Sequence, residues 1–318
     1  MEGFEFVRAD TYAEALAQWT PESMYVAGGT DLLPNLKHRL FSPRRVIGLG
    51  SISGSIDQVD GRVVIGAAVT LETLANSDIV RQTISPLSVA AGLVAGPQLR
   101  TMGTLGGNIL LDTRCLYYNQ TESWRKALGY CLKKDGTWCH VIGGPKTCVA
   151  SQSSDTVPVL LALDASIRLL GFGGVREMRL RDLFQFNGMD HLTIPPGELL
   201  TDIMVPNPAE GFRGSYDKVR TRDSIDFPQV GVAIAGRWAG SAAHALDIVI
   251  GAVNPQPKPI RGLEEHLGQR LDRARIAAIS DLVYKQTRPQ ASAHGDTAWR
   301  RQMASVLVRR ALTTLAGQ

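Results

Sequence analysis

Residues 26–33, VAGGTDLL, place two glycines between an apolar run and a second apolar stretch. Gly28 and Gly29 can adopt positive φ and expose backbone N–H groups with no Cβ in the way. Thr30 adds a hydroxyl, and a helix that began at Asp31 would add its own free N–H groups. The stretch therefore predicts a strand–turn–helix unit that can hold an anion such as a phosphate.

A second turn of the same design follows at residues 103–108, GTLGGN. Gly106 and Gly107 expose the backbone, while Thr104 and Asn108 supply side-chain hydrogen bonds. A single turn of this kind is also explained as a tight strand–helix connection. Two of them indicate a ligand with two phosphates. Neither turn matches G-x-G-x-x-G or the P-loop sequence, which disfavours an ordinary Rossmann or Walker site.

The patterns around the turns predict a mixed α+β chain. Residues 155–171, DTVPVLLALDASIRLLG, predict a helix and then a strand, and β-rich runs precede them. From Gly211 onward the pattern changes to long antiparallel strands and amphipathic helices, one of them at 261–269, RGLEEHLGQ. We expect three parts: two subdomains at 1–53 and 54–210, and a C-terminal domain at 211–318.

Composition limits the classes of partner. The chain has 318 residues, 44% of them hydrophobic and 20% charged, and a formal net charge of +4 without a dense basic run. This predicts no nucleic-acid partner. No apolar run reaches the length of a membrane span, and the acidic N-terminus does not resemble a signal peptide. We therefore expect a cytoplasmic protein with no membrane span.

All four cysteines lie in residues 112–153, a segment without helix or strand periodicity that we call the cysteine loop. They contain no C-x-x-C pair, which weakens a zinc-ribbon or thioredoxin-like interpretation. Four thiolates are the usual ligands of one [4Fe–4S] cluster, and the loop's excess of basic residues would offset the cluster's negative charge. Spacing alone leaves a cluster, a zinc ion and inert buried thiols as alternatives. The four are Cys115, Cys131, Cys139 and Cys148.

Three stretches together resemble a known family: AGGTDLL (27–33), GTLGGN (103–108) and KVRTRDSIDFPQVGVAI (218–234). They are similar to the FAD-binding medium subunit of the xanthine oxidase family of molybdenum hydroxylases, over essentially the whole chain. The resemblance implies a FAD-binding domain of the PCMH, or vanillyl-alcohol-oxidase, type in two subdomains. It also implies a C-terminal domain like that of the carbon monoxide dehydrogenase flavoprotein, an antiparallel sheet with helices.

The cysteine loop interrupts a motif that is continuous in most of that family. GGNILL (106–111) and SSDTVPVLLALDA (153–165) match its two halves. A cysteine-bearing insertion at this point resembles the β subunit of 4-hydroxybenzoyl-CoA reductase, whose extra loop binds a [4Fe–4S] cluster. The resemblance thus implies that the four cysteines hold such a cluster.

The same resemblance implies which residues contact FAD. It assigns the first turn to the pyrophosphate, the second to the ribityl chain and phosphates, Asp155 to ribityl or ribose hydroxyls, Leu200 to a ring face, and Lys218 to the ring's vicinity. Val94 departs from the family, where a larger side chain is often found near the flavin. The expected FAD-binding residues are Tyr25, Val26, Ala27, Gly28, Gly29, Thr30, Asp31, Thr104, Gly107, Asn108, Asp155, Leu200 and Lys218.

The function so implied is electron transfer, because the chain has no molybdopterin signature and no further cysteines for [2Fe–2S] centres. The implied partners are a molybdopterin-binding large subunit and a [2Fe–2S] small subunit in a dimer of heterotrimers, with ferredoxin as electron donor for 4-hydroxybenzoyl-CoA reduction. The alternative is the flavin subunit of another molybdenum hydroxylase that acts on an aromatic or heterocyclic substrate. Two other classes stay open: a stand-alone NAD(P)H-dependent flavoenzyme related to UDP-N-acetylenolpyruvylglucosamine reductases, and a zinc-stapled binding module.

Overall fold

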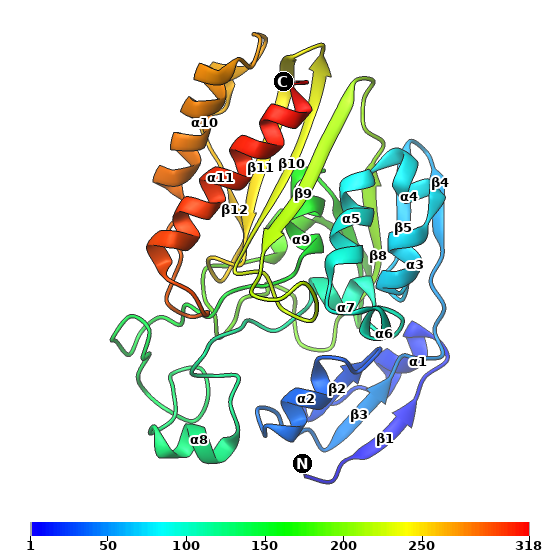
Figure 1. Cartoon of the computed structure of the whole chain (residues 1–318). Coiled ribbons are helices and arrows are strands. Elements are labelled where there is room, and N and C mark those ends of the chain that lie inside the picture. The colour runs from blue at the N-terminus through cyan, green and yellow to red at the C-terminus, as the bar shows by residue number, and fades with distance from the viewer. Residues whose placement is uncertain (1, 318) are drawn as a thin grey trace.

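The computed structural model describes residues 2–317 and shows three separate sheets, each with its own helices (Figure 1). The N-terminal sheet, in blue, lies at the bottom of that view, and a five-stranded sheet lies above it. The C-terminal sheet and its two long helices stand beside the five-stranded sheet. This arrangement confirms the predicted α+β class.

The N-terminal sheet consists of three short parallel strands in the order β1-β3-β2. Their register aligns Arg8, Gly48 and Val26, the last residue of each strand, in one row. Because parallel strands end at the same edge of a sheet, the loops that follow all three gather there. The elements are β1 (Glu5–Arg8), α1 (Tyr12–Ala17), β2 (Ser23–Val26), α2 (Leu32–Lys37) and β3 (Arg45–Gly48).

The middle sheet has five antiparallel strands in the order β4-β5-β8-β6-β7. Strand β8 is the last of these in the sequence but lies between β5 and β6, so it joins segments from both sides of the cysteine loop. The elements are β4 (Ile56–Val59), β5 (Arg62–Gly66), α3 (Leu71–Asn76), α4 (Asp78–Thr83), α5 (Ser85–Leu93), α6 (Pro97–Arg100), α7 (Leu105–Ile109), α9 (Thr156–Ala162), β6 (Ser166–Gly171), β7 (Gly174–Arg179), the 3₁₀ turn η1 (Leu180–Leu183) and β8 (Leu199–Pro206).

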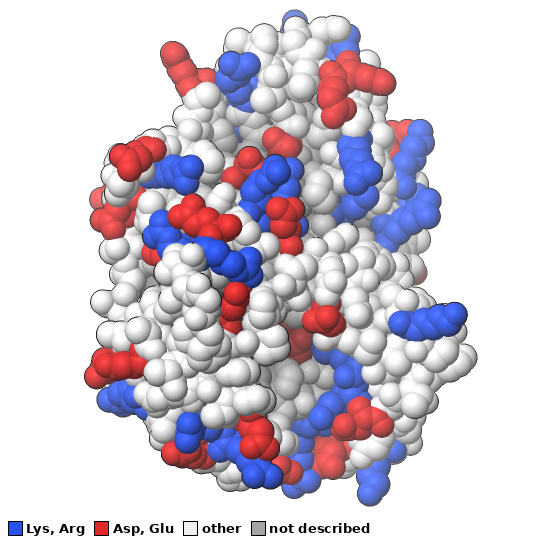
Figure 2. Space-filling model, turned by 180° about the vertical axis from the view of Figure 1, so that it is seen from behind, with Lys and Arg blue, Asp and Glu red and all other residues white. Residues whose placement is uncertain are grey.

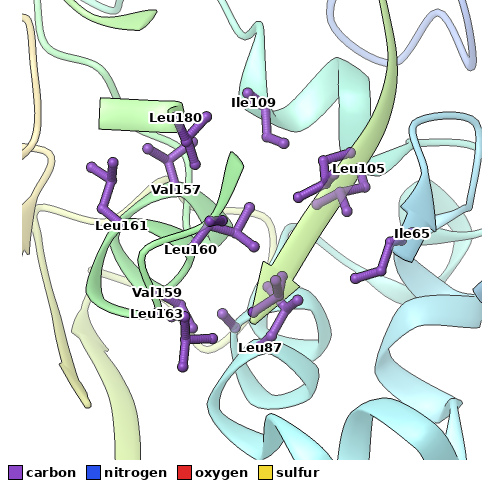
Figure 3. Close-up of a cluster of buried hydrophobic side chains, with 14 of the residues drawn as sticks. Ile65, Leu87, Leu105, Ile109, Val157, Val159, Leu160, Leu161, Leu163 and Leu180 are labelled. Atoms are coloured by element: carbon purple, nitrogen blue, oxygen red, sulfur yellow. The ribbon is translucent and has the colours of Figure 1, made fainter. Parts of the chain in front are cut away.

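The main hydrophobic core lies between this sheet and helices α5, α7 and α9 (Figure 3). Leu105 and Ile109 of α7 are fully buried in it, together with Leu160 of α9, Leu87 of α5 and Ile65 of β5. Removing apolar side chains of this size from water is the main favourable term in folding. Since α7 starts within the second glycine turn, its burial fixes that turn against the sheet.

The C-terminal sheet has the antiparallel order β12-β11-β10-β9. In β10, Ala233 and Ala235 belong to the main core, whereas Val232 and Ile234 belong to a second core formed with α10 and α11. This alternation follows from the two-residue period of a strand. The elements are β9 (Phe212–Val219), β10 (Val230–Ala239), β11 (Ala242–Gly251), β12 (Lys258–Pro259), α10 (Arg273–Gln286) and α11 (Thr297–Leu315).

The helix predicted at 261–269 is wrong. Only a 3₁₀ turn, η2 (Glu264–His266), forms there. Gly262 and Gly268 adopt φ values of 82° and 72°, which an α-helix does not contain. The apolar pattern predicted a helix, but the segment between these two left-handed glycines is too short to form one.

The cysteine loop leaves the fold and returns to it at one point. Arg114 and Ser151 exchange backbone hydrogen bonds of 2.8 Å, which closes the base of the loop. One α-helix lies within it among the described residues, α8 (Glu122–Ala127). Arg125 of α8 is buried and donates to the carbonyl of His38, at the end of α2. The loop therefore packs beside the N-terminal sheet, at the lower left of Figure 1.

The surface carries both signs of charge. Figure 2 shows basic and acidic side chains interspersed over the face seen from behind, in keeping with the small net charge of +4. Within residues 2–317, no helix combines the length and the apolar character that crossing a membrane requires.

Candidate functional site

The two glycine turns, more than seventy positions apart in the sequence, touch each other. A Cβ atom on Gly28 would lie 1.8 Å from the backbone oxygen of Met102, and one on Gly103 would lie 3.5 Å from Oγ1 of Thr30. Gly29 has a φ of 71°, which strains any other residue. The backbones can approach this closely only because side chains are missing, so the two predicted turns form one site.

A cleft of about 400 Å³ opens beside the first turn. It lies at the edge where the three parallel strands end, the usual place for ligands in open parallel sheets. Val26, Ala27, Gly28 and Gly29 were predicted from the sequence and line this cleft. Its other lining residues were not predicted from the sequence; they are Phe4, Phe6, Arg8, Leu33, Val46, Gly48, Gly50 and Ser51.

The second turn is tied to the other side of the cysteine loop. Oγ1 of Thr104 accepts a hydrogen bond of 3.1 Å from the N–H of Gly107 and caps α7. Oδ1 of Asn108 accepts hydrogen bonds from the hydroxyls of Ser154 at 2.6 Å and Thr156 at 2.7 Å. These bonds rejoin the two halves of the motif that the loop interrupts.

Asp155 and Lys218 form a buried ion pair. Nζ of Lys218 lies 2.9 Å from Oδ1 of Asp155, and the hydroxyl of Tyr216 donates to the same oxygen at 2.7 Å. Burial raises the pKa of Asp155 and lowers that of Lys218, while their mutual attraction opposes both shifts. The ion pair thus links the segment after the cysteine loop to the C-terminal sheet. The predicted contacts of Asp155 and Lys218 with FAD stay predictions.

Three other predicted residues also have protein partners. Tyr25 donates its hydroxyl to the carbonyl of Gly197 at 3.1 Å, and burial raises its pKa to about 12. Asp31 is ion-paired with Arg114, at the base of the cysteine loop. Leu200 is buried in the main core, and the structure does not place it in the cleft beside the first turn. The pair at Asp31 links the first turn directly to the loop.

The four cysteines line one small cavity of about 10 Å³, and all four are free and buried. The other residues that line it are Tyr117, Tyr118, Leu132, Lys133, His140, Val141 and Ala150. Burial raises the pKa of Cys115 to about 12, and the neighbouring thiols add to this effect. Among residues 2–317, no group of three or more His, Cys, Asp or Glu side chains is arranged to hold a metal ion. The structure thus gathers the four sulfurs without presenting a finished ligand geometry.

Two family profiles together account for nearly the whole chain. The profile described as "FAD binding domain in molybdopterin dehydrogenase" matches residues 2–208. The chain belongs to this family. The profile described as "CO dehydrogenase flavoprotein C-terminal domain" matches residues 215–315, so this FAD-binding subunit also carries the predicted second domain. The predicted domain boundaries near 53 and 210 stay predictions.

Known relatives of this FAD-binding subunit are oxidoreductase subunits. The aldehyde oxidoreductase FAD-binding subunit PaoB of Escherichia coli is 31% identical over 92% of each chain. The carbon monoxide dehydrogenase medium chain of Afipia carboxidovorans is 27% identical over 97% of this chain and 95% of that one. Among solved structures, the cyanide-inactivated Cu,Mo-CO dehydrogenase matches with a TM-score of 0.80 and 26% identity, over 98% of this chain and 97% of that chain. These likenesses confirm the predicted fold and the molybdenum hydroxylase family.

The residues around the turns fit FAD. The cleft is lined by Arg8, by Phe6, a residue that is 56% exposed, and by the glycines of the first turn. A cation and free backbone suit a diphosphate, and an exposed ring suits an aromatic base. The signal that could have revealed Arg8 and Gly48 is their position at the ends of β1 and β3, which run parallel to the strand before the first turn. The chain is therefore the FAD-binding, electron-transferring subunit of an oxidoreductase.

Proposed function

We propose that this chain carries electrons between the iron–sulfur subunit of a molybdenum hydroxylase and an external redox partner, with FAD held across the two glycine turns. The observation that carries the proposal is the contact of the first turn with the second, beside a cleft of about 400 Å³. FAD exchanges electrons in pairs or singly when bound, and the protein supplies its position and electrostatic surroundings. The chain's own residues shape a diphosphate cradle at the two turns.

The relatives' names support an assembly of several subunits. Several are called medium chains or subunits, among them those of carbon monoxide dehydrogenase, glyceraldehyde dehydrogenase and nicotine 6-hydroxylase. We infer a molybdopterin-binding large subunit and a [2Fe–2S] small subunit, assembled as a dimer of heterotrimers. Purification of the native complex, with its mass and its molybdenum and iron content, tests this assembly; a chain that purifies alone with full activity on a substrate contradicts it.

We also propose that the cysteine loop binds one [4Fe–4S] cluster. Four buried thiols that line one cavity are a donor set of the right chemistry and number. Such a cluster supplies one-electron transfer when bound. The cavity holds about 10 Å³, so the thiols must move apart as a cluster is inserted, which a loop with one short helix can accommodate.

Replacing Cys139 with Ser tests the cluster separately from the flavin. Backbone hydrogen bonds between Arg114 and Ser151 close the base of the loop. Loss of iron from the loop should therefore leave the flavin site intact. The parent should contain about four irons and four acid-labile sulfides per chain. The variant should lose the iron and keep its flavin. Zinc in the parent, or no metal at all, would contradict the proposal.

For the substrate, we propose an oxidation with electrons flowing outward through FAD, since the relatives are named for aldehyde, carbon monoxide and xanthine oxidation. The four-cysteine cavity favours a second candidate, the reductive dehydroxylation of 4-hydroxybenzoyl-CoA with ferredoxin as donor. With an aldehyde as electron donor, the purified complex should reduce a redox dye. If it instead turns over 4-hydroxybenzoyl-CoA with reduced ferredoxin and no aldehyde, the second candidate is correct.

A further inference from the structure

Lys133 is a buried cation at the wall of the cysteine cavity. Its side chain is 6% exposed, and it lines the cavity with the four thiols. Its Nζ lies 2.5 Å from Oδ1 of Asp112, 2.5 Å from Oγ1 of Thr113 and 2.9 Å from the carbonyl oxygen of Gly188. An ammonium has three N–H donors, and each has an acceptor here. The charge is thus held at one place by fixed partners from three directions.

The ion pair has a definite orientation. Lys133 lines the cavity, whereas Asp112 is not among the described residues that line it. Oδ2 of Asp112 accepts a hydrogen bond of 2.8 Å from the hydroxyl of Tyr118, so both carboxylate oxygens have partners. Nζ of Lys133 also lies 4.4 Å from the centre of the Tyr118 ring. Lys133 therefore belongs to the cavity wall, where its charge opposes the rise that burial causes in the pKa of the Cys148 thiol. Asp112 bonds to Lys133 and Tyr118 and does not line the cavity.

The neighbouring lysine is different. The side chain of Lys134 is 31% exposed and lies 3.3 Å from Asp135, whose side chain is 46% exposed. Solvent screens a pair of this kind, and such pairs contribute little. Lys134 therefore offers a matched control with the same charge, next to Lys133 in the sequence.

We propose that Lys133 raises the reduction potential of the cluster in the cysteine loop and that Asp112 limits this effect. The inference rests on the proposed function, because it requires the cluster. A four-cysteine [4Fe–4S] centre carries a net charge of about −2 and becomes more negative on reduction, so a nearby buried cation favours the reduced form. The attraction is strong because charges interact more strongly in a low-dielectric interior than in water.

Charge and structural support predict different results for a pair of variants. Removing the cation in Lys133→Gln should lower the cluster's potential, whereas removing the anion in Asp112→Asn should raise it. The double variant should return toward the parent. If Lys133 were only a structural anchor, both single variants would loosen the same contact and would shift the potential in the same direction or lose iron together.

The test uses the full-length chain, purified without oxygen, with iron and sulfide counted and the cluster titrated by electron paramagnetic resonance. We expect Lys133→Gln to shift the reduction equilibrium at least tenfold, which is about 59 mV for a one-electron couple. Asp112→Asn should shift it in the opposite direction, and Lys134→Gln should leave it unchanged. The flavin content of the three single variants and of the double variant should match that of the parent.

The outcomes separate this inference from the proposed function. A parent chain without iron refutes both. A parent with iron, but with the same potential in Lys133→Gln and Asp112→Asn, refutes only the role of Lys133. If Lys133→Gln loses its iron, the test rests on Asp112→Asn alone. A reduction potential that is unchanged or lower in Asp112→Asn then overturns the proposal.

Discussion

Gly28→Ala should separate the two glycine turns and weaken FAD binding. The added Cβ would lie 1.8 Å from the backbone oxygen of Met102, so the turns must move apart by at least 1.2 Å to restore the 3.0 Å that real contacts require. A shift of this size breaks at least one hydrogen bond to a charged phosphate, worth about 1.5–3 kcal/mol. We therefore expect the affinity for FAD to fall by about 10- to 100-fold.

Gly173→Ala is the matched control, because Gly173 is not among the residues that line the cleft and a Cβ there would meet nothing within 4 Å. Apoprotein of the parent and of both variants is titrated with FAD by flavin fluorescence, and each melting temperature is recorded without FAD. Gly173→Ala should bind FAD like the parent. If Gly28→Ala binds FAD with the parent's affinity while folded, the turns are not the pyrophosphate site.

Three further predictions concern other contacts. Asp155→Asn should lower the free energy of unfolding, measured with urea, by about 3–5 kcal/mol because it leaves the Lys218 charge buried and unpaired. The double variant with Lys218→Met should recover part of this loss. Equal stability of Asp155→Asn and the parent would contradict the pairing. Burial raises the pKa of Tyr25 from 10.0 to about 12, so the folded protein keeps this proton longer than the unfolded chain. The contribution of protonated Tyr25 to the free energy of unfolding is complete below pH 10 and is lost between pH 10 and 12. Tyr25→Phe should remove this decline from the pH dependence of unfolding. Gly188→Ala would place a Cβ 2.8 Å from Sγ of Cys148 and should lower iron retention without loss of flavin, whereas Gly144→Ala, with nothing within 4 Å, should retain both.

The sequence by itself determined the features that depend on local backbone chemistry. Gly28, Gly29 and Gly107 mark turns because only glycine combines positive φ or close approach with an exposed backbone. The strand at β10 and the helix of residues 156–162 also appear directly in the sequence, since each is a nearly continuous apolar run. The same reasoning failed at residues 261–269, where two left-handed glycines outweighed a helical spacing.

Only the tertiary structure decided which distant residues meet. It joined Asp155 to Lys218, placed Leu200 in the core, and brought Arg8 and Gly48 to the edge of the cleft. It also placed Lys133 in the wall of the cysteine cavity and left the Lys134 side chain more exposed, although the two are neighbours in an irregular loop. Contacts of this kind depend on how sheets and helices pack, and a one-dimensional pattern carries no information about partners that lie dozens of residues apart. Patterns in the sequence indicate individual elements, but the burial of side chains between elements decides the site.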